Sequence, residues 1–137
     1  MALSPTEMEI ARHLVRVLVV DDEEGIRHLL TAILTKQGYE VTEACDGDEA
    51  RLFLEHGAFE VVVADYLMPG RLNGIDVLRV AKSVNPACQV VIITGDSGPG
   101  IQEKAIAFGA ADYIPKPFSL VVIQKAVANA AAMARTS

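Results

Sequence analysis

Short apolar runs recur along the chain, with longer segments of mixed polarity between them. The runs are Val15–Val20, Glu40–Ala44, Glu60–Ala64, Gln89–Thr94 and Asp112–Ile114. In three of them, at 17–20, 61–64 and 90–93, apolar residues follow one another without alternation, as expected for strands covered on both faces. This pattern predicts a parallel β-sheet.

The intervening segments place apolar residues three or four positions apart, which is the spacing of amphipathic helices. Their apolar positions are Ile26, Leu29, Leu30, Ile33 and Leu34; Ala50, Leu52, Phe53 and Leu54; Ile75, Leu78 and Ala81; Ile101, Ala105, Ile106 and Phe108; and Leu120, Ile123, Val127 and Ala130. Gly38, Gly57 and Gly109 follow three of these helices, where a left-handed residue commonly ends a helix, and Pro86 ends another. A strand followed by a helix is therefore predicted five times in succession.

This alternation favours a doubly wound α/β fold, a three-layer (βα)5 sandwich with helices on both faces of a five-stranded parallel sheet. The natural strand order is the flavodoxin-like 2-1-3-4-5, which puts the functional crevice at the carboxyl ends of strands one and three. We expect one domain over residues 15–134, an N-terminal extension over 1–14 and a tail over 135–137. Because Ser4-Pro5-Thr6-Glu7 resembles a capping box, residues 5–13 are a candidate short helix.

Composition narrows the classes of protein that fit. A chain of 137 residues with 51% apolar content can fill one core, and its net charge of −6 disfavours direct binding to nucleic acid or an anionic membrane. The polar N-terminus and the lack of a long apolar run predict no signal peptide, no membrane span and a cytoplasmic location. Cys45 and Cys88 lack metal-ligand spacing, so we expect buried free thiols.

Acidic residues gather at the predicted crevice. Asp21-Asp22-Glu23 follows strand one, and Asp65 ends strand three. Repulsion among these carboxylates would be costly without a nearby cation. A hard divalent ion such as Mg²⁺ prefers oxygen ligands of this kind. For Asp21 and Asp22 alone, capping of the following helix is an equally good explanation. Asp65 favours a metal site, because it follows a buried strand and precedes a long loop over residues 66–74.

Two more polar residues lie at neighbouring strand ends. Taken singly, Thr94 reads as an ordinary turn residue and Lys116 as a solvated lysine. Together, a carboxylate nucleophile, a metal, a hydroxyl and an ammonium group provide what phosphoryl transfer needs. Pro117 restricts the backbone of Lys116 to an extended conformation and makes their peptide bond a candidate for the cis form.

Over about residues 15 to 130, these features resemble the CheY-like receiver domains of two-component signalling. The resemblance rests on Asp21-Asp22, on Asp65 with Met68-Pro69, on Gly74, on Thr94-Gly95, on Gly109-Ala110 and on Lys116-Pro117-Phe118. It implies that Asp65 is the phosphoacceptor. It also implies that Asp22, supported by Asp21, holds Mg²⁺ or Mn²⁺ together with Asp65 and the backbone carbonyl of Leu67.

The resemblance assigns three further roles. Thr94 would bond a phosphoryl oxygen, and Lys116 would pair with the carboxylate or the phosphoryl group. Tyr113 occupies the position of the family's switch aromatic, although without its neighbours plain packing of a strand aromatic on a helix would be the preferred explanation. Phosphorylation would then bias the surface formed by the helix at 101–108, the strand at 112–114 and the helix from 120 onward.

The implied donor is a sensor histidine kinase or a histidine phosphotransfer protein, which would dock near the first helix and Phe118. The implied target of the switch surface is a downstream protein, an effector domain or a second copy in a homodimer. Such a domain promotes its own phosphorylation and dephosphorylation and is not a turnover enzyme. No direct contact with nucleic acid or membrane is expected.

The sequence departs from the family pattern in two places. The loop after Asp65 is about one residue longer than usual and ends in Asn73 instead of Asp, which changes the loop's shape but preserves a helix cap. The glycines of Ser97-Gly98-Pro99-Gly100 should weaken the first turn of the fourth helix.

Other classes with this fold fit less well. In an FMN-binding flavodoxin, Asp21-Asp22-Glu23 would repel the cofactor's phosphate, and a haloacid-dehalogenase-type phosphatase would need an acid where Leu67 stands. The serious alternative is a pseudo-receiver that binds protein partners without phosphorylation.

Overall fold

The computed structural model describes residues 2, 4–5, 14–95 and 98–136. Its elements in chain order are β1 (Arg16–Val20), α2 (Glu24–Lys36), β2 (Glu40–Ala44), α3 (Gly47–His56), β3 (Val61–Asp65), α4 (Gly74–Val84), β4 (Gln89–Thr94), α5 (Ile101–Ala107), β5 (Asp112–Pro115) and α6 (Leu120–Thr136). All neighbouring strands pair in parallel, in the order β2-β1-β3-β4-β5. The predicted fold is confirmed. The candidate helix at 5–13 falls, apart from residue 5, outside the described residues, as does Ser97.

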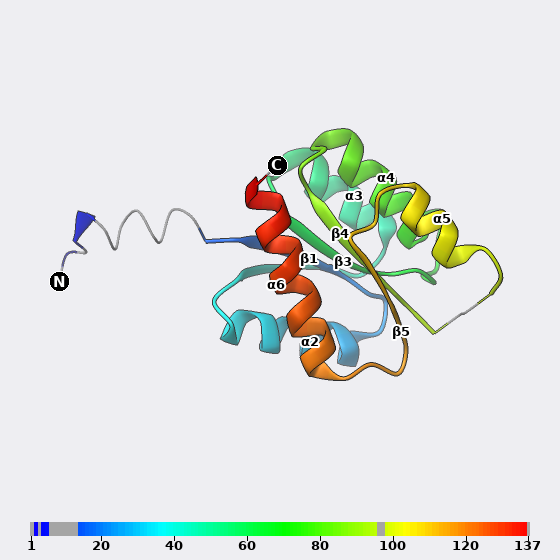
Figure 1. Ribbon diagram of the computed structural model, residues 1–137, viewed down its shortest axis with the longest axis horizontal. Helices are drawn as coiled ribbons and strands as arrows, with labels where there is room; N and C mark the ends of the chain where they lie inside the picture. The colour runs from blue at the N-terminus through cyan, green and yellow to red at the C-terminus, as the bar shows by residue number, and fades with distance from the viewer. Residues whose placement is uncertain (1, 3, 6–13, 96–97, 137) are drawn as a thin grey trace.

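The helices cover both faces of the sheet, with α2 and α6 on one face and α3, α4 and α5 on the other (Figure 1). Alternate residues of a strand enter different cores: Leu18 and Val62 pack with α3 to α5, whereas Val17 and Val61 pack with α2 and α6. Because both faces of the central strands are buried, both sets of positions must be apolar. This explains the unbroken apolar runs in the sequence.

Two of the three glycines expected to end helices in a left-handed conformation do so. Gly38 has a φ of 100° and Gly109 a φ of 94°. Gly57 is different, and the prediction was wrong there: it is extended, with a φ of −136°. A Cβ at Gly57 would lie 3.2 Å from the Phe53 carbonyl oxygen and from the Phe59 ring, so the position is tight for a side chain.

Three other expectations need correction or adjustment. Cys88 is buried as expected, but Cys45 is exposed, because it follows the edge strand β2 in the turn before α3. Helix α5 begins only at Ile101, after Gly100 with a φ of 85°, so the glycines precede the helix and do not form its first turn. Helix α6 continues to Thr136, past residue 134, where we placed the end of the domain.

Membrane-spanning character was tested on the described part of the chain. None of its helices has both the length and the apolar character that crossing a bilayer requires.

Helix α4 begins directly against the end of β3. The Gly74 N–H donates to the Tyr66 carbonyl at 2.9 Å. As expected, Asn73 caps the helix: its side chain accepts from the Asp76 N–H at 3.0 Å, and the Asp76 carboxylate accepts from the Asn73 N–H at 2.9 Å. A Cβ at Gly74 would lie only 2.5 Å from the Asp65 carbonyl oxygen. A glycine is therefore required for this close approach.

We expect Gly74→Ala to lower the free energy of unfolding by about 2–3 kcal/mol, because the added methyl meets backbone atoms that cannot rotate away. Urea denaturation followed by far-ultraviolet circular dichroism measures this loss. Gly25→Ala in α2 is the matched control, since nothing lies within 4 Å of a Cβ at that position. Equal stability of the two variants would contradict the steric argument.

Candidate functional site

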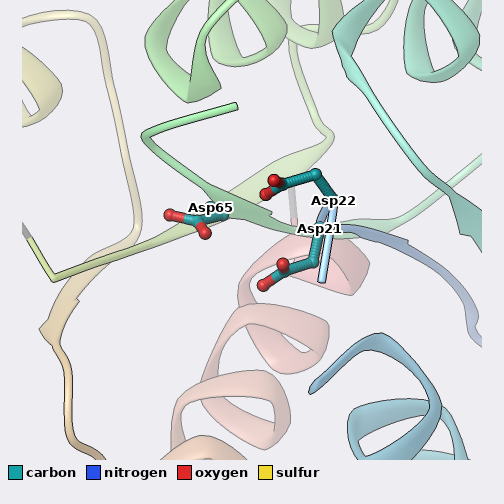
Figure 2. Close-up of side chains that lie close together, drawn as sticks. All are labelled: Asp21, Asp22 and Asp65. Atoms are coloured by element: carbon teal, nitrogen blue, oxygen red, sulfur yellow. The ribbon is translucent and has the colours of Figure 1, made fainter. Parts of the chain in front are cut away.

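Three carboxylates meet at the carboxyl edge of the sheet. Asp21 and Asp22 directly follow β1, and Asp65 is the last residue of β3, the strand paired with β1. One carboxylate oxygen from each lies within 4.8 Å of the others. In Figure 2 the three side chains extend toward the same side. Asp21 and Asp65 are buried, whereas Asp22 is exposed, so this is a half-enclosed acidic site.

Lys116 reaches this acidic site from the turn after β5. Its ammonium nitrogen Nζ donates to Asp65 Oδ2 at 2.9 Å and lies 3.8 Å from Asp21 Oδ2 and 3.6 Å from Glu23 Oε1. Partial burial alone would lower the pKa of Lys116. The hydrogen bond to Asp65 and the nearby carboxylates outweigh it, so the pKa is raised above its usual range. The ammonium group therefore stays protonated at neutral pH.

The backbone around Lys116 is also fixed. Its N–H donates to the Thr94 carbonyl at 2.8 Å, which extends the β4–β5 pairing by one residue. The Lys116–Pro117 peptide bond is cis, as the sequence had suggested.

Asp21 is the most perturbed acid of the described site. Burial raises its pKa from the usual 3.8 to about 6, and the charges of Asp65 and Asp22 add to the rise, while the Glu23 N–H and Lys116 oppose it. The Glu23 N–H donates to Asp21 Oδ1 at 2.8 Å. The capping explanation for Asp21 and Asp22 fails, because the N-cap of α2 is Glu23, which makes no side-chain capping bond.

Sequence reasoning missed Arg27, which holds the backbone beneath the acidic pair. Its Nη1 donates to the Asp21 carbonyl oxygen at 2.8 Å, and its Nε donates to Glu43 Oε1 on β2 at 3.0 Å. The side chain is only 15% exposed, so this contact is better shielded from water than a surface ion pair. A single sequence gives no signal for this pairing, because Arg27 and Glu43 lie 16 residues apart.

Thr94 and Tyr113 lie on adjacent strands and on one face of the sheet. Thr94 is buried at the end of β4, two residues after Ile92, a member of the core on the α3–α5 side. Tyr113 pairs with Ile92 and packs against the same core. Its side chain also lines a cavity of about 160 Å³ beside Gly98, Gly100 and Glu103, next to the start of α5.

The structure thus brings Asp21, Asp22, Asp65 and Lys116 together and places Thr94 at the neighbouring strand end. Leu67, whose carbonyl the resemblance proposed as a metal ligand, follows Asp65 by two residues, and its N–H donates to Asp65 Oδ1 at 3.2 Å. The fold and the site define a doubly wound α/β domain with an acidic centre at the carboxyl edge of its sheet.

Comparisons with known proteins narrow this class. Residues 17–128 match the model of the response regulator receiver domain. Response regulator MprA of Mycobacterium sp. (strain KMS) is 37% identical over 106 residues, which are 77% of this chain and 46% of that protein. The uncharacterized transcriptional regulatory protein YcbL of Bacillus subtilis (strain 168) is 32% identical over 104 residues, 76% of this chain and 45% of YcbL.

A solved structure agrees with these relatives. The CheY-like response regulator receiver domain protein from Methanospirillum hungatei JF-1 has a TM-score of 0.82 and 26% identity, and the match covers 90% of this chain and 99% of that one. The chain belongs to the response regulator receiver domain family of two-component signalling. It spans about half the length of the curated relatives MprA and YcbL.

The raised pKa of Asp21 predicts that this acid destabilises the metal-free fold. The penalty is absent below the unfolded pKa of 3.8, develops as the pH rises toward 6 and is complete above it. In EDTA at neutral pH, Asp21→Asn should therefore raise the free energy of unfolding by on the order of 2 kcal/mol, and the gain should vanish near pH 4. Urea titrations across this pH range measure the gain.

Glu40→Gln is the control, because Glu40 is an exposed acid remote from the site, at the start of β2. It should change the free energy of unfolding little at any pH. A metal-free Asp21→Asn protein that is less stable than the unsubstituted protein at neutral pH would contradict the assignment.

Proposed function

We propose that this domain accepts a phosphoryl group on Asp65 from a phosphohistidine donor. The observation that carries the proposal is the 2.9 Å contact of Lys116 Nζ with Asp65 Oδ2, beside carboxylate oxygens of Asp21 and Asp22. One ammonium group among several carboxylates leaves an excess of negative charge, which suits a site that also binds a cation. Receiver domains in general bind Mg²⁺.

Asp65 is the nucleophile of the proposed step. One of its carboxylate oxygens attacks the phosphorus, so that an O–P bond forms while the N–P bond to the donor imidazole breaks. The departing nitrogen keeps the electron pair, and the donor leaves as neutral imidazole because its other ring nitrogen carries a proton. Lys116 and the Leu67 N–H orient the Asp65 carboxylate, because each donates to a different oxygen of it. The hydroxyl of Thr94 would donate to a transferred oxygen.

The residues present fit a divalent metal ion. Asp21, Asp22, Asp65 and the carbonyl of Leu67 would hold Mg²⁺, and Mn²⁺ accepts the same oxygen ligands. When bound, such an ion neutralises charge on the transferred phosphoryl oxygens. The exposure of Asp22 beside the buried Asp21 leaves one side of the site open to solvent and to a donor.

Thr94 and Tyr113 would transmit the effect of phosphorylation from Asp65 to the surface of the domain. Phosphorylation adds about −1.5 to −2 charge beside Thr94, and an inward shift of this residue would open space for the Tyr113 ring on the same face of the sheet. The α5–β5–α6 surface, on which Ile106, Val121 and Val122 are exposed, would then change its affinity for a partner.

The partners follow from the same proposal. A sensor histidine kinase or phosphotransfer protein would supply the phosphoryl group near α2 and Phe118. A downstream protein, an effector domain or a second copy would use the α5–β5–α6 surface, and the names of the longer relatives, a response regulator and a transcriptional regulatory protein, support an effector. We place this activity in the cytoplasm and regard the domain as a switch without substrate turnover.

A pseudo-receiver function is not favoured, because every position that the chemistry needs carries a suitable residue. Asp21, Asp22, Asp65, Thr94 and Lys116 all lie at the carboxyl edge of the sheet. A module that bound partners without phosphorylation would gain nothing from the burial of Asp21, which disfavours its charged form.

Intact-mass spectrometry after incubation with acetyl phosphate and Mg²⁺ tests the proposal. We expect one phosphate adduct that disappears at alkaline pH, in EDTA and in Asp65→Asn. Asp76→Asn is the matched control, because Asp76 lies in the adjoining α4 cap and should still permit the adduct.

Beryllofluoride provides a second measurement that needs no phosphodonor. With Mg²⁺ it should bind the unsubstituted domain and not Asp65→Asn. Failure of both the adduct and beryllofluoride binding would reject the phosphoacceptor function in favour of the pseudo-receiver.

A further inference from the structure

We propose that the N-terminus of α3 positions the loop that follows Asp65, and that Gly47 is the positioning residue. The inference rests on the proposed function, because it concerns the loop that carries the Leu67 carbonyl. Through this contact, a helix that contributes no residue to the acidic cluster would influence the geometry of the site.

The evidence is the close approach of Leu72 to Gly47. A Cβ at Gly47 would lie 2.5 Å from Leu72 Cβ, 2.7 Å from the Leu72 carbonyl oxygen and 3.2 Å from its carbonyl carbon. Two of these atoms belong to the backbone, so rotation of the Leu72 side chain would not relieve the overlap. Any side chain at Gly47 must displace either α3 or the loop.

Helix α3 is anchored by Ala50 and Leu54, which are buried in the core, so the loop is the part that must move. The Asp46 side chain accepts from the Glu49 N–H at 2.8 Å, and the Glu49 carboxylate accepts from the Cys45 N–H at 3.0 Å. The first bond caps the helix at Asp46, and the second ties its first turn to Cys45, the residue that follows β2. Displacing the helix would disturb the core packing of Ala50 and Leu54.

The loop cannot absorb the displacement at its far end. Asn73 is fixed by its own capping box, and Gly74 lies against the Asp65 carbonyl, where a Cβ would be 2.5 Å from the oxygen. A shift at Leu72 must therefore pass back along residues 67–71, toward the Leu67 N–H that donates to Asp65 Oδ1. The exposed Arg71–Asp48 ion pair, at 3.7 Å, adds little to the anchor because water screens it.

Mg²⁺ affinity, measured by isothermal titration calorimetry without any phosphodonor, tests the anchor. We expect Gly47→Ala to weaken Mg²⁺ binding about 5- to 10-fold, at the lower edge of the effect of a supporting shell on metal affinity. Gly25→Ala is the matched control: it adds the same methyl to the first turn of α2 in open space and should bind Mg²⁺ like the unsubstituted domain. Amide shifts of residues 66–72 should move only in Gly47→Ala.

Leu72→Gly tests the contact from the other side. Loss of the Leu72 side chain should also weaken Mg²⁺ binding, and the two losses should be less than additive in Gly47→Ala/Leu72→Gly, because removing Leu72 Cβ relieves the shortest overlap and leaves only those with the backbone. Arg71→Gly introduces the same backbone freedom one residue away and should have less than a 2-fold effect. If Gly47→Ala does not fold, Leu72→Gly against Arg71→Gly decides the question.

The possible outcomes separate this inference from the proposed function. An unsubstituted domain that neither binds Mg²⁺ nor accepts phosphate would remove the proposed function. Normal Mg²⁺ affinity in Gly47→Ala and Leu72→Gly, with only their unfolding free energies reduced, would overturn the positioning role. Equal losses in Leu72→Gly and Arg71→Gly would also overturn it, since general loop flexibility would then be the cause.

Discussion

The electrostatic cost of placing buried carboxylates side by side constrains this whole structure. Asp21 and Asp65 are buried at the ends of two apolar strands, burial disfavours the charged form of Asp21, and one ammonium group offsets only part of the repulsion between the carboxylates. A flexible scaffold would relax by moving the acids apart. The parallel pairing of β1 with β3 prevents this, because strand register fixes where each backbone ends.

Contacts outside the acidic cluster hold the strand ends in this costly arrangement. Arg27 ties the Asp21 carbonyl to β2 through Glu43, and Gly74 lets the first turn of α4 press against the Asp65 carbonyl. Both contacts engage backbone atoms, so they fix the carboxylates without neutralising them. The excess negative charge therefore remains available for a cation or a phosphoryl group. The stability of the two packed cores offsets the unfavourable electrostatic free energy of this arrangement.

The sequence predicted the features that depend on strand pattern and failed where they depend on tertiary contacts. Unbroken apolar runs identify buried parallel strands, and a parallel sheet brings its carboxyl ends to one edge, so Asp65 and Lys116 could be placed together in advance. Arg27 could not be recognised, because its partner Glu43 belongs to another element. Gly57 and Cys45 were misjudged because the path of the chain and the edge position of β2 are not encoded locally.

The acidic site contacts the helices on the two faces of the sheet in different ways. On the α2–α6 face, Arg27 contacts the acidic cluster only at the Asp21 backbone carbonyl and is itself held by Glu43. On the other face, Thr94 and Tyr113 lead toward α5, and the loop through Leu72 leads to Gly47 on α3. Helix α5 has seven residues and no side-chain cap, whereas α3 has ten residues and is capped by Asp46. Helix α5 is therefore the helix that a change of charge at the site can displace. Helix α3 is the more rigid of the two and can fix the resting geometry of the loop after Asp65.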